Sequence, residues 1–324
     1  MILLIGDRDD PHLQTLCEQL SKFSDSQILS TLYEDLLNTE FSFESDVNGS
    51  VSCLIYQKDI KIDLNNISSA FCLTPMFRLQ GIERETTQEF RFWYFSWKEA
   101  LFGFYSILAF REKFVNQSIQ NCLRCQSKIM TFMAAHQVGI KTTNSYVGNS
   151  KDSIFNFLEH NEPGALKTLH QMNLSHEGEP TMLLTQKVYL EDFSSYQQSH
   201  ESPLFLQKYL EKKYDLRLII IGQKVMSCKI DATQSPVGQV DYRAYDLPNT
   251  PHSEVEIPVD LHNKVLQLCN LLQLEYACLD FCVDFSGQYW LLDVNPFGRY
   301  LWMEYATGMP ISNSLSDFLM NRKK

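Results

Sequence analysis

The sequence lacks any long apolar run. No stretch approaches the roughly 20 consecutive apolar residues that a membrane-spanning helix needs. Residues 93–110 are rich in aromatic side chains, but Lys98 and Glu99 interrupt them. The chain opens with MILLIGDRDD, which has no basic residue ahead of its apolar part and soon reaches Asp7, so it predicts an opening strand and not a signal peptide. We therefore expect no membrane association.

Positive charge is also scarce. The chain carries 28 Lys and Arg against 39 Asp and Glu, a formal net charge of −11. Because affinity for nucleic acid rests largely on neutralising phosphates, this balance argues against a general nucleic-acid-binding protein. It still allows a few lysines and arginines to gather in one cleft.

The cysteines do not form a disulfide or metal pattern. There are nine, an odd number, scattered through apolar segments, which is typical of reduced thiols in a cytoplasmic protein. Cys122 and Cys125 form a C-x-x-C pair, but no second pair stands at metal-ligand spacing and the surrounding sequence looks helical. A Ser-His or Cys-His signature of nucleophilic catalysis is also lacking. These features favour structural cysteines.

What the sequence does contain is an alternation of strand-like and helix-like segments over 324 residues, enough for two or three domains. Met1–Gly6 reads as a strand and a helix follows near His12–Lys22. Further strands follow at Gln27–Leu32, Val51–Tyr56 and Ser69–Leu73. This rhythm predicts a small α/β domain over about the first hundred residues.

A long helix is predicted at Gln88–Leu108, with one aromatic face. The residues of that face are Phe90, Trp93 and Trp97, with Phe92 and Phe95 alongside. Packing of the helix on a sheet explains them most simply. A peptide-binding groove and a homodimer interface are the alternatives.

The last predicted strand, Tyr289–Val294, ends on oxygen-bearing side chains. Asp293 and Asn295 are two positions apart, so both point to one face of the strand. The tight turn Phe285–Gln288 makes this strand the second arm of a hairpin, which places Asp280 opposite them. Three oxygen ligands at the end of a dry sheet suit Mg2+, with phosphate oxygens and water completing its octahedron. A turn with solvated carboxylates is the simpler alternative.

Three cations stand in or beside apolar segments upstream. Lys128 lies near the start of a predicted helix, Lys167 within the strand-like segment 164–168, and Arg217 within the strand 215–221. Cations inside apolar strands need anionic partners, and a nucleoside triphosphate would supply them. A lone lysine, in contrast, is normally a surface residue with its head group in water.

The order of these residues resembles the ATP-grasp ligases. The ordered set is a lysine on a helix (Lys128), a lysine on a strand (Lys167), Gln-x-Tyr-Leu (Gln207–Leu210), Asp-Leu-Arg (Asp215–Arg217), Asp280 and Asp-x-Asn-Pro (Asp293–Pro296). Within that superfamily, the ending NPFGRYLWMEY looks like the peptide ligases that make microviridins and related graspetides, as do PISNSLSDFL and Asp241-Tyr242-Arg243. The resemblance is close over residues 191–324 and fair over residues 114–190. Over residues 1–113 it is limited to size and layout.

The resemblance implies an α/β (α+β) architecture, namely an ATP-grasp fold preceded by a pre-ATP-grasp α/β domain. It divides the chain into a pre-ATP-grasp domain at 1–113, a central ATP-grasp subdomain at 114–190, and a C-terminal ATP-grasp subdomain with the metal site at 191–324. Between the middle strands, Asn173–Pro180 is expected to be a polar hairpin-type segment that could close over a nucleotide.

The resemblance also implies roles toward ATP and magnesium. Lys128 and Lys167 would hold the α- and β-phosphates, and Arg217 the γ-phosphate or an acyl phosphate. Lys167 and Arg217 would thus be the catalytic cations. The residues implied to hold Mg2+ are Asp280, Asp293 and Asn295.

Adenine and the acceptor peptide have implied positions as well. The residues of the adenine hinge, acting mostly through the backbone, would be Gln207, Lys208, Tyr209 and Leu210. Asp241 and Arg243 would lie near the acceptor peptide, although a simple ion pair is the alternative. Two residues depart from the common pattern: Lys208 stands where an acidic residue is frequent, and Asp293 where glutamate is frequent.

The implied function is that of an ATP-dependent, ADP-forming ligase in the cytoplasm. Such an enzyme phosphorylates Asp or Glu side-chain carboxylates of a ribosomal precursor peptide, leader plus core, and closes ω-ester or ω-amide macrocycles. Two alternatives stay open at this point. One is an ATP-grasp ligase acting on a small molecule or a protein C-terminus, and the other is a non-catalytic peptide-binding module.

Overall fold

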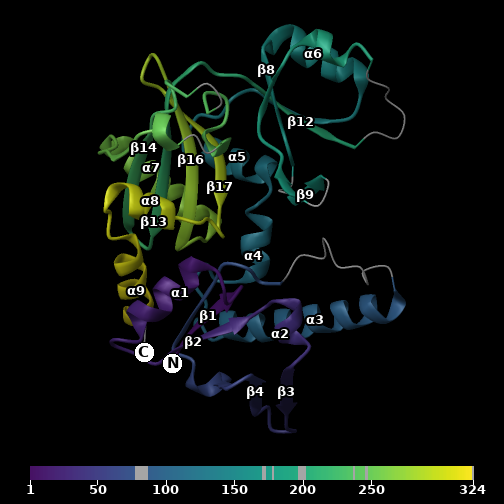
Figure 1. Cartoon of the computed structure of the whole chain (residues 1–324), viewed down its shortest axis with the longest axis vertical. Coiled ribbons are helices and arrows are strands. Elements are labelled where there is room, and N and C mark those ends of the chain that lie inside the picture. The colour runs from purple at the N-terminus through teal and green to yellow at the C-terminus, as the bar shows by residue number, and fades with distance from the viewer. Residues whose placement is uncertain are drawn as a thin grey trace.

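The computed structural model describes residues 1–76, 87–169, 173–176, 179–195, 202–235, 238–244 and 247–322. Helices and strands are mixed along the whole chain, so the α/β class expected from the sequence is confirmed. Three sheet-containing parts are visible in Figure 1. The first part lies at the bottom with both chain ends, a large sheet lies above it, and a smaller sheet lies beside that one at the top.

The first part is built on a parallel sheet with the strand order β2-β1-β6. Its strands are β1 (Ile2–Gly6), β2 (Ser26–Ser30) and β6 (Ser69–Cys72), and α1 (Pro11–Leu20) connects the first two. Alternate residues of β1 enter two different cores, with Leu4 in one and Leu3 in the other. The strand is therefore apolar throughout, as the parallel pattern requires.

An antiparallel sheet extends this first part. Its strands, in order, are β3 (Thr39–Ser45), β4 (Val51–Gln57) and β5 (Ile60–Asp63); α2 (Tyr33–Leu36) precedes them and the 3-10 turn Leu64–Asn66 follows. Strand β3 was not predicted from the sequence. Its only apolar residues are Phe41 and Phe43, and most of its residues are exposed.

The long helix α3 (Gln88–Phe110) is confirmed, with Thr87 capping its start. Core packing also holds for part of its aromatic face, because Phe90, Trp93 and Trp97 belong to the core of the first part. The expectation was wrong for Phe92 and Phe95, whose residues are 78% and 53% exposed. At 100° per residue these two positions fall on the opposite side of the helix.

The smaller sheet is antiparallel, with the order β11-β8-β12-β7. Its strands are β7 (Ser145–Gly148), β8 (Gly164–Lys167), β11 (Gln186–Val188) and β12 (Leu204–Lys208), and α6 (Lys151–Asn161) packs on them. Strand β12 lies beyond the boundary expected after residue 190, yet it pairs with both β7 and β8. This sheet therefore draws strands from both sides of that boundary.

A separate pair of strands, β9 (Asn173–His176) and β10 (Glu179–Met182), forms an antiparallel two-stranded sheet. The polar segment expected to be a hairpin thus contains two paired strands. The residues between them, 177 and 178, lie outside the described part of the chain.

The large sheet is antiparallel, with the order β15-β14-β13-β16-β17. Its strands are β13 (Lys212–Ile221), β14 (Lys224–Ile230), β15 (His252–Glu254), β16 (Tyr276–Asp284) and β17 (Tyr289–Asn295). The helices near it are α4 (Ile119–Arg124), α5 (Lys128–Gln137), α7 (Val259–Leu272), α8 (Leu301–Thr307) and α9 (Ile311–Asn321). The predicted hairpin between the last two strands is confirmed.

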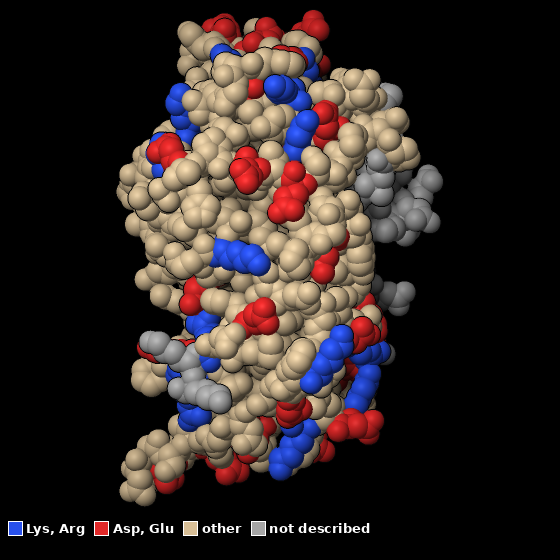
Figure 2. Space-filling model, turned by 90° about the vertical axis from the view of Figure 1, so that its left-hand side faces the viewer, with Lys and Arg blue, Asp and Glu red and all other residues tan. Residues whose placement is uncertain are grey.

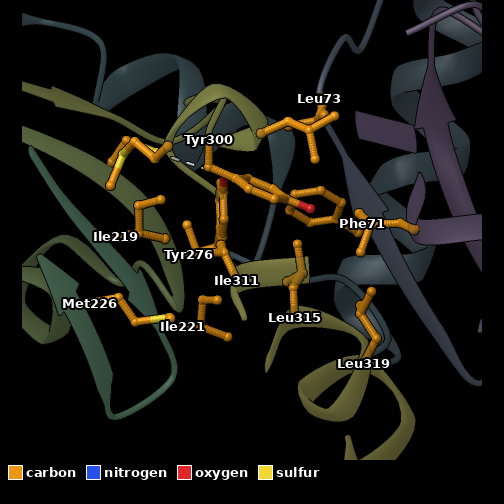
Figure 3. Close-up of a cluster of buried hydrophobic side chains, with 14 of the residues drawn as sticks. Phe71, Leu73, Ile219, Ile221, Met226, Tyr276, Tyr300, Ile311, Leu315 and Leu319 are labelled. Atoms are coloured by element: carbon orange, nitrogen blue, oxygen red, sulfur yellow. Dashed lines mark hydrogen bonds between the residues drawn. The ribbon is translucent and has the colours of Figure 1, made fainter. Parts of the chain in front are cut away.

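The two faces of this sheet are covered differently. Even-numbered residues of β13, such as Leu216 and Leu218, pack in one core with α5 and α7. On the other face, Ile219 and Tyr276 pack with Phe71 of the first part and with side chains from α9 (Figure 3). Further along β13, toward its first residues, this second face leaves the core and borders a pocket.

No helix among the described residues is long and apolar enough to cross a membrane. The space-filling view shows Lys and Arg interspersed with Asp and Glu over the face that it presents (Figure 2). The net negative charge is thus spread over this face and does not form one acidic patch there.

Candidate active site

A pocket lies between the large sheet and the smaller sheet. It is lined by α5, β8, β12 with the residues that follow it, β13, β16 and β17, and by the segment 240–243. Every site residue predicted from the sequence lines this pocket except Arg217. Residues that lie far apart in the sequence are thus brought together at one place, as the resemblance implied.

The two carboxylates face each other across the hairpin. Asp280 on β16 is directly opposite Asp293 on β17, so their side chains leave the sheet on the same face. A β-bulge brings this about, because Phe281 pairs with Leu291 and one extra residue, Leu292, precedes Asp293. If the pairing of Phe281 with Leu291 continued without a bulge, Asp280 would face Leu292 and Asp293 would point into the helix-covered core.

Both carboxylates are partnered through one oxygen. Asp293 Oδ1 accepts a hydrogen bond of 2.6 Å from Lys128 Nζ, and Asp280 Oδ1 accepts one of 2.7 Å from Arg217. Tyr242 also donates to Asp280 Oδ1, at 3.3 Å. In the described part of the chain, the Oδ2 atoms of Asp280 and Asp293 accept no hydrogen bond. They are free to bind a cation.

The third expected ligand, Asn295, follows Asp293 on the same face of β17. Its Oδ1 accepts a hydrogen bond of 3.0 Å from the Phe297 backbone, so the turn proposed as the simpler alternative is present as well. An amide oxygen has a second lone pair for a metal. The described residues contain no group of three His, Cys, Asp or Glu that could hold a metal. The donors of Asp280, Asp293 and Asn295 are carboxylate and amide oxygens, which fit a hard cation such as Mg2+ when phosphate and water complete its shell.

Two lysines stand above these carboxylates. Lys167 is half-buried at the end of β8. Burial and the nearby Lys128 together lower its pKa to about 8, although Asp293 partly offsets both. Two ammonium groups close to one carboxylate in a partly desolvated pocket leave positive charge uncompensated, so the pocket favours an anion.

Arg217 lies behind the pocket. It sits on the central strand β13, directly opposite Asp280, and is only 7% exposed. Burial opposes its charge, but Asp280 outweighs burial and raises its pKa. Its second nitrogen donates to the Arg299 carbonyl at 3.0 Å, and its guanidinium lies 5.9 Å from the centre of the Trp302 ring. Arg217 is therefore charged and held beneath Asp280.

The segment expected to be the adenine hinge follows β12. Gln207 is buried, and its side chain donates to the hydroxyls of Thr143 and Ser145 at 3.0 and 3.2 Å. The backbone N–H groups of Lys208 and Tyr209 donate to carbonyls of neighbouring segments, both at 2.9 Å. The Lys208 side chain is exposed, so the departure from an acidic residue affects a group that points to solvent.

Asp241 and Arg243 form the ion pair that the sequence left as an alternative. Arg243 Nε donates to Asp241 Oδ1 at 2.8 Å, and the backbone of Thr185 donates to Asp241 Oδ2 at 3.0 Å. Burial raises the pKa of Asp241, but Arg243 and these hydrogen bonds outweigh it, so the pKa is lowered and the carboxylate stays charged. Both residues line the pocket.

Sequence reasoning missed a second lysine–carboxylate pair in the pocket. Lys212 Nζ and Asp215 Oδ2 lie 2.7 Å apart at the start of β13. Because the effect of burial is only partly offset by Lys212, the pKa of Asp215 is raised to about 6. The available signal was an aspartate at the head of an apolar strand, which had been used only as part of the Asp-Leu-Arg motif.

The sequence matches no protein-family model, and no curated protein resembles it in sequence. Solved structures do resemble it. A RiPP-associated ATP-grasp ligase of Chryseobacterium gregarium, in complex with ADP and a leader and core peptide, matches with a TM-score of 0.86 and 21% identity, covering 100% of this chain and 97% of that chain. Macrocyclase MdnC from Microcystis aeruginosa MRC, bound with precursor peptide MdnA, matches with a TM-score of 0.83 and 20% identity, covering 99% and 100%.

The ATP-grasp ligase PsnB, complexed with a minimal precursor, Mg and ADP, matches with a TM-score of 0.75 and 16% identity, covering 100% of this chain and 97% of that chain. At such identities the likeness shows the fold. The ATP-grasp fold expected from the sequence is therefore confirmed over the full length of the chain.

Proposed function

We propose that this protein is an ATP-dependent, ADP-forming ligase that closes macrocycles in a ribosomally made precursor peptide. It joins an Asp or Glu side-chain carboxylate to a hydroxyl or amine of the same peptide, giving an ω-ester or an ω-amide. The observation that carries this proposal is the pocket in which Lys128 and Lys167 face Asp280 and Asp293. The peptide-bound ligases of the same fold support a leader and core peptide as the partner.

ATP would lie along this pocket. Lys128 and Lys167 would neutralise its α- and β-phosphates, and a bound phosphate would raise the pKa of Lys167 again because it compensates the ammonium charge. Adenine would contact the backbone of Gln207–Leu210. Asp280, Asp293 and Asn295 would hold Mg2+, whose chemical contribution is to neutralise charge on the transferring phosphoryl group.

The reaction begins at a substrate carboxylate, which is a poor electrophile. One carboxylate oxygen attacks the γ-phosphorus of ATP, the bond to the β-phosphate oxygen breaks, and an acyl phosphate and ADP form. A hydroxyl or amine of the peptide then attacks the acyl carbon, loses its proton and expels inorganic phosphate. Each ring thus removes the elements of one water from the peptide. Arg217 would stabilise the transferring or the acyl phosphate, so that with Lys167 it supplies the catalytic positive charge.

Peptide binding would involve the Asp241–Arg243 pair at the pocket wall. Because Arg243 neutralises Asp241, the pair presents little net charge, and its Arg243 side chain is 33% exposed for hydrogen bonds to a peptide. A cytoplasmic location is supported by the nine cysteines, all within the described residues and all unpaired.

A homodimer through α3 is also part of the proposal. Phe92 and Phe110 are both exposed, and each lies nine residues from Leu101 along α3. Between them, no atom lies within 4 Å of a Cβ placed on Gly103, so the surface there is open. Two copies of α3 packed antiparallel would bring each Phe92 against a Phe110, which is a self-complementary arrangement. Sedimentation of the wild type and of the Phe92→Ser/Phe110→Ser variant tests this. A dimer that persists in the variant would contradict it.

Mass spectrometry tests the central proposal. The candidate precursor peptide is incubated with the protein, ATP and Mg2+, and the Asp293→Asn variant serves as the isosteric control. ATP-dependent losses in whole steps of one water, absent with the control, are expected. ADP without a mass loss would point instead to a ligase with a different acceptor. Peptide binding without ADP would leave a non-catalytic binding module.

A further inference from the structure

The segment that joins Asn295 to helix α8 is held from the opposite end of the chain. It comprises residues 296–300, and Tyr300 is the N-cap of α8. Within the described residues, the Tyr300 side chain makes no capping hydrogen bond. The free N–H groups at the start of α8 need an acceptor from elsewhere, because helix termini leave their first donors unpaired.

His12 supplies that acceptor. Its Nε2 lies 3.1 Å from the backbone nitrogen of Tyr300 and 3.0 Å from that of Leu301. Backbone N–H groups only donate, so Nε2 must be the unprotonated ring nitrogen. The ring proton is then on Nδ1, which donates to Asp10 Oδ1 at 2.8 Å. His12 therefore caps a helix that begins 289 residues later in the chain.

Asp10 holds both the histidine and the segment. Its Oδ1 also caps α1 by accepting from the His12 backbone, and its Oδ2 accepts from Arg299 Nε and from a terminal Arg299 nitrogen at 3.0 and 2.7 Å. Burial raises the pKa of Asp10, but His12 and Arg299 outweigh it and the carboxylate stays charged. Asp10 and His12 are each only 6% exposed.

The same segment orients Arg217. The Arg299 carbonyl accepts from one terminal nitrogen of Arg217 at 3.0 Å, and Asp280 Oδ1 accepts from the other at 2.7 Å. Arg217 Nε is buried and has no partner among the described residues. Two hydrogen bonds therefore set the plane of this guanidinium, and one of them depends on where the Arg299 carbonyl points.

We propose that His12 is a positioning residue for Arg217: by capping α8 it aims the Arg299 carbonyl at the guanidinium and so fixes Arg217 beneath Asp280. A helix cap alone would need only a local Ser or Asp at position 300. The need to position Arg217 explains why a buried Asp–His pair from the first part of the chain caps this helix instead. The inference rests on the proposed role of Arg217 at the terminal phosphate.

The test compares two amides at position 12. His12→Gln carries its amide near the position of Nε2 and can still accept from Tyr300 and Leu301. His12→Asn carries the same group one methylene shorter, near Nδ1, so it can contact Asp10 but cannot reach the helix. Binding of ADP and of the β,γ-imido analogue of ATP, each with Mg2+, is measured by calorimetry on the full chain.

We expect His12→Asn to weaken binding of the ATP analogue about tenfold, as loss of a well-oriented charged contact does, and binding of ADP by less than about twofold. His12→Gln should bind both nucleotides nearly as the wild type does. Equal weakening of both nucleotides in His12→Asn would mean a purely structural role and would overturn the inference, and so would unchanged binding of both. A wild type that binds neither nucleotide would instead overturn the proposed function, and this inference with it.

Discussion

Two ion pairs stand side by side on one face of the large sheet. Arg217 with Asp280 and Lys128 with Asp293 both join a cation to a carboxylate, and the two carboxylates are cross-strand neighbours. They differ in burial: the side chains of the first pair are 8% and 20% exposed, and those of the second 16% and 27%. The difference in burial is modest, but the surroundings differ more than these fractions suggest.

The guanidinium of Arg217 contacts three protein groups: the Asp280 carboxylate, the Arg299 carbonyl and the Trp302 ring. Lys128 borders the pocket and lies close enough to Lys167 to lower its pKa. The first pair is thus compensated by the protein itself. The second pair belongs to a set with excess positive charge, which a ligand would compensate. Neighbouring pairs of the same chemistry can therefore differ in how far the protein itself compensates their charge.

Breaking the enclosed pair should have the largest effect. Arg217→Met leaves Asp280 charged without its main partner, and loss of one member of a buried pair typically costs about 3–5 kcal/mol. Lys128→Met should cost about 1 kcal/mol or less, because it also relieves the repulsion with Lys167. Urea unfolding of both variants measures the difference.

A double variant controls for this comparison. Arg217→Met combined with Asp280→Leu removes the whole pair, and an apolar replacement of a buried pair is often neutral, so most of the lost stability should return. Similar free energies of unfolding for Arg217→Met and Lys128→Met would remove the distinction between the two pairs.

Neutralising the pocket carboxylate should affect chemistry more than stability. Asp293→Asn keeps the shape of the side chain but removes one charged oxygen from the expected metal site. We expect ligation to fall at least about 100-fold, while peptide binding stays within about twofold. Asn295→Ala should act in the same direction. Ring formation followed by mass spectrometry measures the loss, and a variant that ligates at the normal rate would contradict the metal assignment.

The sequence was sufficient to bring most of this site together. The turn at 285–288 and the spacing of Asp293 and Asn295 predicted the facing carboxylates, since both features are local. The bulge at Leu292 was not predictable, because it depends on which face of the strand meets the helices. Asp293 was nevertheless placed correctly, because the register assumed from the turn pairs it with Asp280, as the structure does.

Non-local features were missed for a different reason. The cap of α8 by His12 joins positions at opposite ends of the chain, and no periodicity links them. Asp215 was used only as part of a motif and its partner Lys212 was not considered, because charge at the head of a strand resembles loop sequence. The exposure of Phe92 was misjudged because aromatic residues occupy both sides of α3, so the helical pattern did not distinguish its two faces.

The pocket lysines should make nucleotide binding depend on pH. Lys167 has a pKa lowered to about 8, so it is charged below that value and neutral above it. Phosphate binds the charged form, so affinity for ADP with Mg2+ should fall about tenfold between pH 7 and 9. Lys167→Arg stays charged over this range and should abolish the decrease. An equal decrease in that variant would assign the dependence to another group.

The smallest effect is expected outside the pocket chemistry, at Lys208. Its side chain is exposed, whereas its backbone N–H is fixed by the Asn144 carbonyl at 2.9 Å. If adenine contacts the hinge through backbone groups, Lys208→Glu leaves those contacts in place and changes only a solvent-screened charge. Affinity for ADP should then change by less than about threefold, and the free energy of unfolding by less than about 0.5 kcal/mol. A change of tenfold or more would mean that the Lys208 side chain folds back over the nucleotide. Its charge would then contact the nucleotide directly, as the charges of Lys128 and Lys167 are proposed to do.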